Sequence, residues 1–342
     1  MKAMVLPQIT DLAANSRPLH LADLPTPVPD DQEILVKVSA CGVCHTELDE
    51  IEGRTPPKRF PVILGHQIIG RVEQRGREAA KFQLGDRVGI GWIHWACGTC
   101  DFCRRGYENL CGDFQATGRD ADGGYAEYTT VSEDFAYPIP EGLTDGEAAP
   151  LLCAGAIGYR SLRLTGIEDG DTLGLLGFGA SAHLVLKMVR FQYPRSRVFV
   201  FSRNPAEREF ASELGAVWTG NFGEEPPEKL RRAIDTTPVW KPIADCLQYL
   251  EKGGRLVINA IRKESVDQKL LLDMDYARDL WLEKEIKSVA NVTRQDIADF
   301  LPLAAKIPMK PEHQEYGLEE ANQALMELKH GKIRGAKVLR LA

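Results

Sequence analysis

Residues 172–191 read TLGLLGFGASAHLVLKMVRF and combine the features of a strand, a glycine turn and a helix. Thr172 to Leu176 form an apolar run of strand length, and 183–191 continue as an apolar helix. Between them, Gly177, Gly179 and Ala182 follow the spacing G-x-G-x-x-G/A. A glycine turn that follows a strand and opens a helix offers free backbone N–H groups to a pyrophosphate. This stretch therefore predicts an α/β sheet that binds a dinucleotide.

The alternation of strands and helices continues along the chain after this motif. The expected elements are a strand at 197–201, a helix at 205–214, a strand near 233–235, a helix at 243–250 and strands at 255–260 and 286–289. Such alternation predicts a doubly wound parallel sheet.

The residues before 150 follow a different pattern, with short strands separated by glycine turns. Apolar and polar residues alternate at 34–38, and further strands are expected within 62–76, 84–88 and 123–128. Short strands of this kind predict a barrel-like β domain. A helix at 318–328 and a strand at 337–341 are expected to return to that domain. The expected organisation is a catalytic domain at 1–150, a nucleotide-binding domain at 151–299 and a return segment at 300–342.

The stretch from Cys41 to Asp49, CGVCHTELD, gathers two thiols, an imidazole and a hydroxyl. A catalytic zinc ion takes three protein ligands of sulfur and nitrogen type and keeps a fourth position open. His66 and Cys153 lie downstream and could complete such a set with one cysteine of the stretch. Taken alone, Cys153 between two apolar neighbours fits a buried hydrophobic position better than a metal ligand.

Four more cysteines lie close together in the segment 97–111. Their spacing is C-x2-C-x2-C-x7-C, formed by Cys97, Cys100, Cys103 and Cys111. Four thiolates leave no open coordination position, so the segment is predicted to be a lobe around a structural zinc ion. A disulfide framework is typical of small secreted chains, and an iron–sulfur cluster would need a redox partner that the sequence does not indicate.

The composition narrows the classes of partner. The length of 342 residues favours two domains. The net charge of −7 argues against nucleic acid as a partner, because phosphate binding needs a basic stripe. No apolar run approaches the roughly 20 residues of a membrane span, and the N-terminal MKAMVLP is too short for a signal peptide. We therefore expect a cytoplasmic protein, in which eight cysteines suit metal binding better than disulfides.

Together, these motifs resemble the zinc-dependent alcohol dehydrogenases of the medium-chain dehydrogenase/reductase family, over essentially the whole chain. The resemblance implies a GroES-like catalytic domain, a Rossmann domain, two zinc ions per chain, a small alcohol or aldehyde substrate and a homo-oligomer, either dimer or tetramer. By the family pattern G-V-C-H-T, the zinc ligand of the first stretch is Cys44, with His66 and Cys153. This ligand set is the known one of alcohol dehydrogenases and is taken from the family. Thr46 would pass on the substrate proton, and His45 would contact the pyrophosphate.

Two departures from the family pattern fall near the predicted catalytic zinc. The family usually reads H-T-D-L-H, whereas this chain has Asp49 in the place of the last histidine. Asp49 is therefore considered as a replacement in proton transfer. The common G-H-E is here G-H-Q, so Gln67 replaces a carboxylate and should leave the zinc a stronger Lewis acid. A metal-free quinone or enone reductase would lack the ligand set, while the change at Asp49 leaves a non-catalytic binding protein as an alternative.

The loop after the second strand of the nucleotide domain bears on the choice of cofactor. An NAD-binding loop usually places an acidic residue there to hold the ribose 2′-hydroxyl. This chain instead has Ser202 and Arg203, and the first acidic residue, Glu207, is expected in the next helix. A hydroxyl and a guanidinium suit the 2′-phosphate of NADP. NADP is favoured, and NAD stays possible because Arg203 could stack on the adenine.

Overall fold

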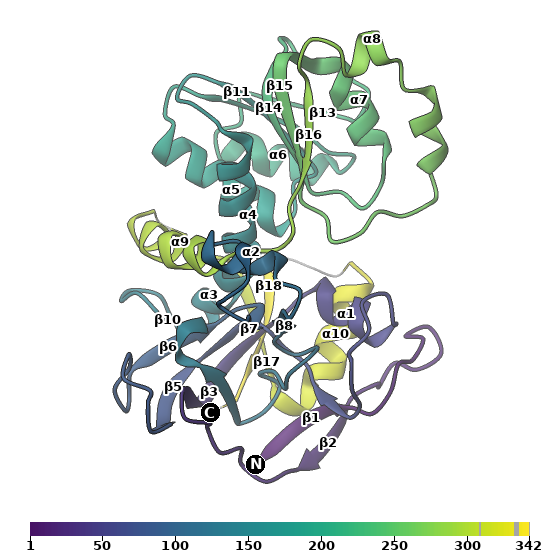
Figure 1. Ribbon diagram of the computed structural model, residues 1–342. Helices are drawn as coiled ribbons and strands as arrows, with labels where there is room; N and C mark the ends of the chain where they lie inside the picture. Colours follow the sequence, from purple (N-terminus) through teal and green to yellow (C-terminus); the bar gives the residue numbers. More distant parts are fainter. Residues whose placement is uncertain (308, 332–334, 342) are drawn as a thin grey trace. The chain divides into compact units, whose positions relative to one another are not determined.

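The computed structural model describes residues 1–307, 309–331 and 335–341 of the chain (Figure 1). The chain divides into two compact units, one formed by Met1–Cys153 with Val292–Ala342 and the other by Ala154–Asn291. Within the described residues, no helix is both long enough and apolar enough to cross a membrane.

The unit Ala154–Asn291 is built on a six-stranded parallel sheet with the order β13-β12-β11-β14-β15-β16. The strands are β11 (Thr172–Leu176), β12 (Arg197–Phe201), β13 (Trp218–Gly220), β14 (Leu230–Asp235), β15 (Leu250–Ile258) and β16 (Glu285–Ser288). The helices are α4 (Ala154–Thr165), α5 (Ala180–Gln192), α6 (Pro205–Glu213), α7 (Lys241–Tyr249) and α8 (Tyr276–Asp279). In Figure 1, α4 and α5 lie on one side of this sheet and α7 on the other. The predicted doubly wound α/β sheet is confirmed.

The central strand β11 is buried along its whole length because it pairs on both sides and is covered by helices. Its residues pair in parallel register with those of β12 and β14, for example Leu176 with Phe201 and with Asp235. The following helix α5 begins at Ala180, earlier than the predicted start at 183, because Gly179 acts as its N-cap. The glycine turn is therefore shorter than expected, and Ala182 lies in the first turn of the helix.

The other unit consists mainly of antiparallel sheets. The larger sheet has the order β10-β6-β5-β3-β18-β17, with β9 paired to β3, and a second sheet has the order β2-β1-β4. Its strands are β1 (Lys2–Leu6), β2 (His20–Asp23), β3 (Glu33–Val43), β4 (Val62–Ile63), β5 (Ile68–Arg75), β6 (Arg87–Ile90), β7 (Ile93–Trp95), β8 (Gln115–Ala116), β9 (Tyr128–Ser132), β10 (Ala136–Pro138), β17 (His313–Gly317) and β18 (Ala336–Arg340). Its α-helices are α1 (His45–Ile51), α2 (Asp101–Arg104), α3 (Asp145–Ala148), α9 (Arg294–Lys306) and α10 (Ala321–Lys329).

The long strand β3 organises this unit, because it pairs with β5, β9 and β18. Lys337 of β18 lies opposite Val43, so the C-terminal strand is adjacent to the residues that lead into Cys44. The helix α9 also belongs to this unit, whereas the sequence placed residues up to 299 with the nucleotide domain. The reason is packing: the Ile297 and Phe300 side chains of α9 are fully buried, and Ile297 lies against Gly91 of the same unit.

Candidate active site

Cys44 lies at the point where β3 passes into α1, and it is the N-cap residue of that helix. Its Sγ accepts the N–H of Thr46 at 3.4 Å, while its own N–H donates to the Glu47 carboxylate at 2.8 Å. A capping residue of this kind satisfies N–H groups that have no partner inside the helix. The local sequence therefore fixes the direction of the Cys44 sulfur.

Cys44, His66 and Cys153 come together in the structure, with their three ligand atoms within 4.8 Å of one another. The Cys44 Sγ lies 3.7 Å from His66 Nε2, and Cys153 follows the short helix η3 (Ala149–Leu152). Cys41 is not part of this cluster, because its sulfur faces the backbone around Gly65 and Gly124. Two thiols and one imidazole converging from three segments fit a zinc ion with one open position.

The electrostatics of these side chains also fit a cation. A hydrogen bond with Cys153, burial and the nearby Glu47 carboxylate raise the pKa of the Cys44 thiol well above its ordinary value. Burial lowers the pKa of His66, but the Glu47 carboxylate and Cys44 outweigh it, so the pKa of His66 is well above its ordinary value. A metal ion would supply the positive charge that holds the cysteines as thiolates.

Glu47 contacts the imidazole of His66 at the ring nitrogen that faces away from Cys44. Its Oε1 lies 2.6 Å from His66 Nδ1, and both side chains are buried. The ring of Trp92 packs edge-on against the imidazole, with centroids 5.0 Å apart. A carboxylate on one ring nitrogen fixes the tautomer and leaves the other nitrogen, here Nε2, to bind a metal. Glu47 had no predicted role, although an acidic residue three positions after Cys44 is a signal that the sequence contains.

We expect Glu47→Gln to weaken metal binding at the Cys44 site by about 10- to 100-fold, the usual cost of losing such a carboxylate. The reason is that a neutral amide orients His66 less firmly and no longer favours the proton on Nδ1. The affinity can be measured by competition with a chelator. Glu52→Gln is the matched control, because Glu52 ends the same helix and pairs with Arg54 and Lys329. Equal affinities in all three proteins would contradict the assignment.

The other residues predicted for catalysis lie on α1. Thr46 is half-buried and His45 is exposed, and among the described residues no hydrogen bond of the Thr46 hydroxyl is recorded. Asp49 is buried and its carboxylate forms an ion pair with Arg54. The structure therefore gives Asp49 a partner that the sequence analysis did not foresee.

The four cysteines of the lobe also converge, with Cys97, Cys100, Cys103 and Cys111 offering sulfurs within 4.8 Å of one another. Short helices order the lobe, which was expected to be irregular: α2, whose N-cap is Cys100, and η1 (Glu108–Leu110). Hydrogen bonds from the backbone of Cys100 and Thr99 lower the pKa of Cys97 to about 6. Four sulfurs surround one point, so the lobe fits a closed structural metal site.

The glycine turn after β11 has the geometry expected of a dinucleotide site. Gly177 has a φ of +84°, and a Cβ there would lie 2.8 Å from Thr236 Oγ1, so only glycine fits without strain. A Cβ at Gly179 would meet nothing within 4 Å, which leaves space in front of the α5 N-terminus. The buried Ala182 lies in the first turn of the helix. These residues can hold a pyrophosphate.

The loop after β12 differs from the expectation in one contact. Ser202 Oγ donates a hydrogen bond to Glu207 Oε2 at 2.6 Å and accepts one from the N–H of Asn204 at 3.1 Å. Glu207 is in helix α6, as expected, but its place in the first turn lets the carboxylate reach back to the strand end. Arg203 is exposed, and within the described ranges no polar partner is recorded for it.

His94, on β7, gives a pH dependence that can be measured. Burial lowers the pKa of His94 to about 4, despite Asp122 and Asp120 nearby. The unfolded chain binds this proton with a pKa near 6.5, so stability is fully present above pH 6.5 and is lost as the pH falls toward 4. This one group should cost about 2 kcal/mol of unfolding free energy between pH 7 and pH 5.

We therefore expect His94→Gln to lose less stability than the wild type over that pH range. The comparison uses denaturant unfolding at each pH, with His20→Gln as the control because His20 is exposed. Parallel losses in wild type and His94→Gln would show that His94 is not responsible.

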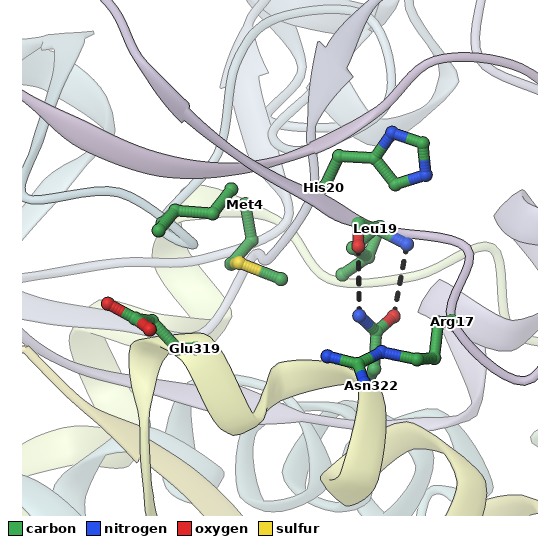
Figure 2. A pocket seen from close by; sticks show the side chains of 7 residues that line it. Met4, Arg17, Leu19, His20, Glu319 and Asn322 are labelled. Atoms are coloured by element: carbon green, nitrogen blue, oxygen red, sulfur yellow. Dashed lines mark hydrogen bonds between the residues drawn. The ribbon is translucent and has the colours of Figure 1, made fainter.

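A surface depression of about 360 Å³ lies elsewhere in the same unit (Figure 2). Its lining residues are Met4, Arg17, Leu19, His20, Leu21, Glu319 and Asn322. The amide of Asn322 accepts the N–H of Leu19 at 3.0 Å and donates to its carbonyl at 2.8 Å. Asn322 therefore anchors the segment before β2 to α10. None of the lining residues belongs to either cysteine cluster, so the depression is separate from both.

Known proteins similar to this chain belong to the family that the sequence motifs predicted. Residues 30–141 match the model of the alcohol dehydrogenase GroES-like domain. A probable alcohol dehydrogenase of Mycobacterium tuberculosis is 42% identical over 327 residues, which are 94% of this chain and 92% of that protein. An alcohol dehydrogenase of Geobacillus stearothermophilus is 32% identical over 94% of this chain and 96% of its own length.

Among solved structures, a cinnamyl alcohol dehydrogenase from Sorghum bicolor has a TM-score of 0.85 at 25% identity, covering 99% of this chain and 97% of that one. The similarity thus extends over both units and includes the segments that carry the two cysteine clusters. The chain belongs to the zinc-type, NAD(P)-linked medium-chain alcohol dehydrogenase family, a family of oxidoreductases that act on alcohols.

Proposed function

We propose that the chain interconverts an alcohol and an aldehyde or ketone by hydride transfer to or from NAD(P), with a catalytic zinc held by Cys44, His66 and Cys153. The observation that carries this proposal is the convergence of two thiols and one imidazole, from three segments, within 4.8 Å. Three ligands leave one tetrahedral position open. When bound, the zinc would polarise the substrate oxygen and the nicotinamide would accept or donate the hydride.

We assign proton transfer, orientation of His66 and pyrophosphate binding to the residues around this site. The N–H of Thr46 is bonded to the Cys44 sulfur, which holds the Thr46 side chain beside a metal ligand. We assign to Thr46 Oγ1 the proton of the substrate hydroxyl. Glu47 keeps the His66 ring oriented, and His45, which is exposed, is assigned to the pyrophosphate. Asp49 is kept as the acceptor of the relayed proton, and this role requires its ion pair with Arg54 to weaken.

Turnover of an alcohol and aldehyde panel with each cofactor tests the function. Activity that disappears with a chelator and returns with zinc would support the proposal. Activity that a chelator leaves unchanged would instead support a metal-free reductase. A protein that holds its metals but turns over no member of the panel would favour the non-catalytic alternative.

We propose two zinc ions per chain, the second in the lobe of residues 97–111, which we define as the zinc lobe. Support comes from two separate sets of converging side chains. One set has four thiols, and the other has two thiols and an imidazole. All eight cysteines are unpaired, and six of them belong to these two sets. Free thiols of this kind favour a reducing compartment, so we also propose a cytoplasmic location.

We propose NADP as the preferred cofactor, with Arg203 as the residue that binds the 2′-phosphate. Arg203→Ala should raise the Michaelis constant for NADPH by about tenfold, the cost of one charge-assisted hydrogen bond, and change that for NADH little. Glu207 opposes this preference, because its carboxylate lies at Ser202 beside the same loop. Glu207→Gln should therefore shift the preference further toward NADPH. A wild type that prefers NADH, or an Arg203→Ala variant with unchanged NADPH kinetics, would overturn the assignment.

We further propose that the chain forms a homo-oligomer through β16. This strand is the edge of the parallel sheet and all its residues are exposed. In an antiparallel pair centred on Ile286, Glu285 of one copy would lie opposite Lys287 of the other, in addition to its ion pair with Arg255. Sedimentation should show a dimer or tetramer that Ile286→Lys dissociates; a monomeric wild type would contradict this proposal.

A further inference from the structure

A buried carboxylate of the zinc lobe reaches the N-terminus of α9. Glu108 lies between Cys103 and Cys111 and only 2% of its surface is exposed. Its Oε1 accepts the backbone N–H of Arg294 at 2.5 Å and the Nε–H of the same residue at 3.2 Å. Because Arg294 is the first residue of α9, the negative charge sits where the helix has unpaired N–H groups and the positive end of its dipole.

The first turn of α9 in turn lies against Gly91, beside the chain that leads into Cys153 and next to a residue that packs against His66. Ile297 lies one turn after Arg294, and a Cβ added to Gly91 would be 2.8 Å from Ile297 Cδ1 and 3.5 Å from the Leu152 carbonyl oxygen. Leu152 directly precedes Cys153. Gly91 directly precedes Trp92, whose ring packs against His66. We therefore expect a shift of this helical turn to change the positions of both Cys153 and His66.

We propose that Glu108 is a positioning residue that couples metal binding in the zinc lobe to metal binding at Cys44, His66 and Cys153. The inference rests on the two zinc sites proposed above. The short elements of the lobe are held together by four sulfurs around one point, so the place of Glu108 depends on the metal that they bind. A filled lobe then fixes the start of α9, and α9 supports the chain at Cys153 and Trp92.

The helix itself does not depend on Glu108. Thr293 and Asp296 form a capping box at its N-terminus, with Thr293 accepting the N–H of Asp296 at 3.2 Å and Asp296 accepting that of Thr293 at 2.8 Å. Arg294 also lies 3.5 Å from Asp134 and over the ring of Phe135. Loss of Glu108 should therefore shift the position of the first turn of α9, while the helix stays folded. This separates a positioning effect from global unfolding.

The test measures the zinc affinity of each site by competition with a chelator at 25 °C, and Cys44→Ser and Cys100→Ala identify which site is which. In Glu108→Gln the zinc lobe should keep its metal while the affinity of the Cys44 site falls about tenfold, the size expected for one charge-assisted hydrogen bond. Glu320→Gln is the matched control. Its carboxylate accepts a backbone N–H at 2.6 Å from Gly317, before α10, and touches neither the lobe nor α9.

The outcomes separate this inference from the proposed function. A wild type with fewer than two zinc ions would overturn the coupling and the proposal of two zinc ions, whereas the proposed hydride transfer is tested separately by turnover. Two zinc ions with an unchanged affinity at the Cys44 site in Glu108→Gln would overturn the coupling alone. If Glu108→Gln releases both metals, Thr293→Ala decides, because it weakens the start of α9 from the helix side and leaves the lobe intact. Reduced affinity at the Cys44 site in Thr293→Ala supports the coupling, and wild-type affinity overturns it.

Discussion

Cys44→Ser is expected to lower the zinc content from about two ions to about one per chain and kcat/KM by about a thousandfold. Serine places a weakly acidic hydroxyl where a thiolate is needed, so only His66 and Cys153 remain as good ligands. A metal that stabilises charge on the substrate oxygen contributes several kcal/mol to the transition state, which corresponds to the expected loss of rate. The fold should be retained, because Cys44 is partly exposed and lies outside the apolar core of its unit.

The control for this variant is Cys41→Ala. Cys41 is three residues earlier on β3 and fully buried, and its sulfur faces Gly65 and Gly124 and lies outside the metal cluster. Cys41→Ala should lose some stability through the small cavity that it leaves but keep both metals and most of its activity. Metal analysis and steady-state kinetics of the two variants give the answer. Full zinc content in Cys44→Ser, or loss of zinc in Cys41→Ala, would reverse the assignment of the ligand.

Cys100→Ala is expected to lower the melting temperature by on the order of 10 °C, because a closed zinc site contributes folding free energy directly. The helices of the lobe, α2 and η1, are short, and Cys100 itself caps α2 by accepting the N–H of Cys103 at 3.5 Å. The substitution thus removes a metal ligand and a helix cap together. The ligands of the Cys44 site are unchanged, so chemistry there should be affected only through the coupling proposed for Glu108.

The matched control is Cys246→Ala, since Cys246 is fully buried in the other unit and belongs to neither metal set. Its loss should cost only the free energy of a small cavity, a few kcal/mol at most. Calorimetry with and without added zinc distinguishes the two effects. If excess zinc stabilises the wild type and Cys100→Ala equally, or if Cys100→Ala melts with the wild type, the metal of the lobe has no structural role.

Several features of the nucleotide unit could be read from the sequence because they depend on neighbouring residues. The strands 172–176 and 197–201 were predicted with the bounds that the structure shows. They are short apolar runs ended by glycine or polar residues, and this local signal is strong when a strand is buried on both faces. The three-residue strand β13 was not predicted, because Trp218–Gly220 is too short to carry a periodic pattern.

The four-cysteine cluster was also determined locally, since all of its ligands lie within one short segment whose spacing already suits a tetrahedral ion. The same holds for the glycine turn, where Gly177 needs a positive φ and Gly179 has open space above it. In both cases the residues that act together are close in the sequence. Their arrangement therefore follows from short-range geometry.

What only the tertiary structure decided is which side chains meet, whether the two residues are five positions apart or lie in distant parts of the chain. Glu47 contacts His66, Glu207 accepts a hydrogen bond from Ser202, Arg54 pairs with Asp49, and Glu108 accepts the N–H of Arg294 at the start of α9. Each of these contacts depends on the direction in which a helix or strand presents a side chain. Of Cys41 and Cys44, the family pattern predicts Cys44 as the ligand, and in the structure only Cys44 lies beside His66. Cys41 lies within β3 and faces Gly65 and Gly124, whereas Cys44 lies past the strand, at the start of α1, where its sulfur turns toward His66.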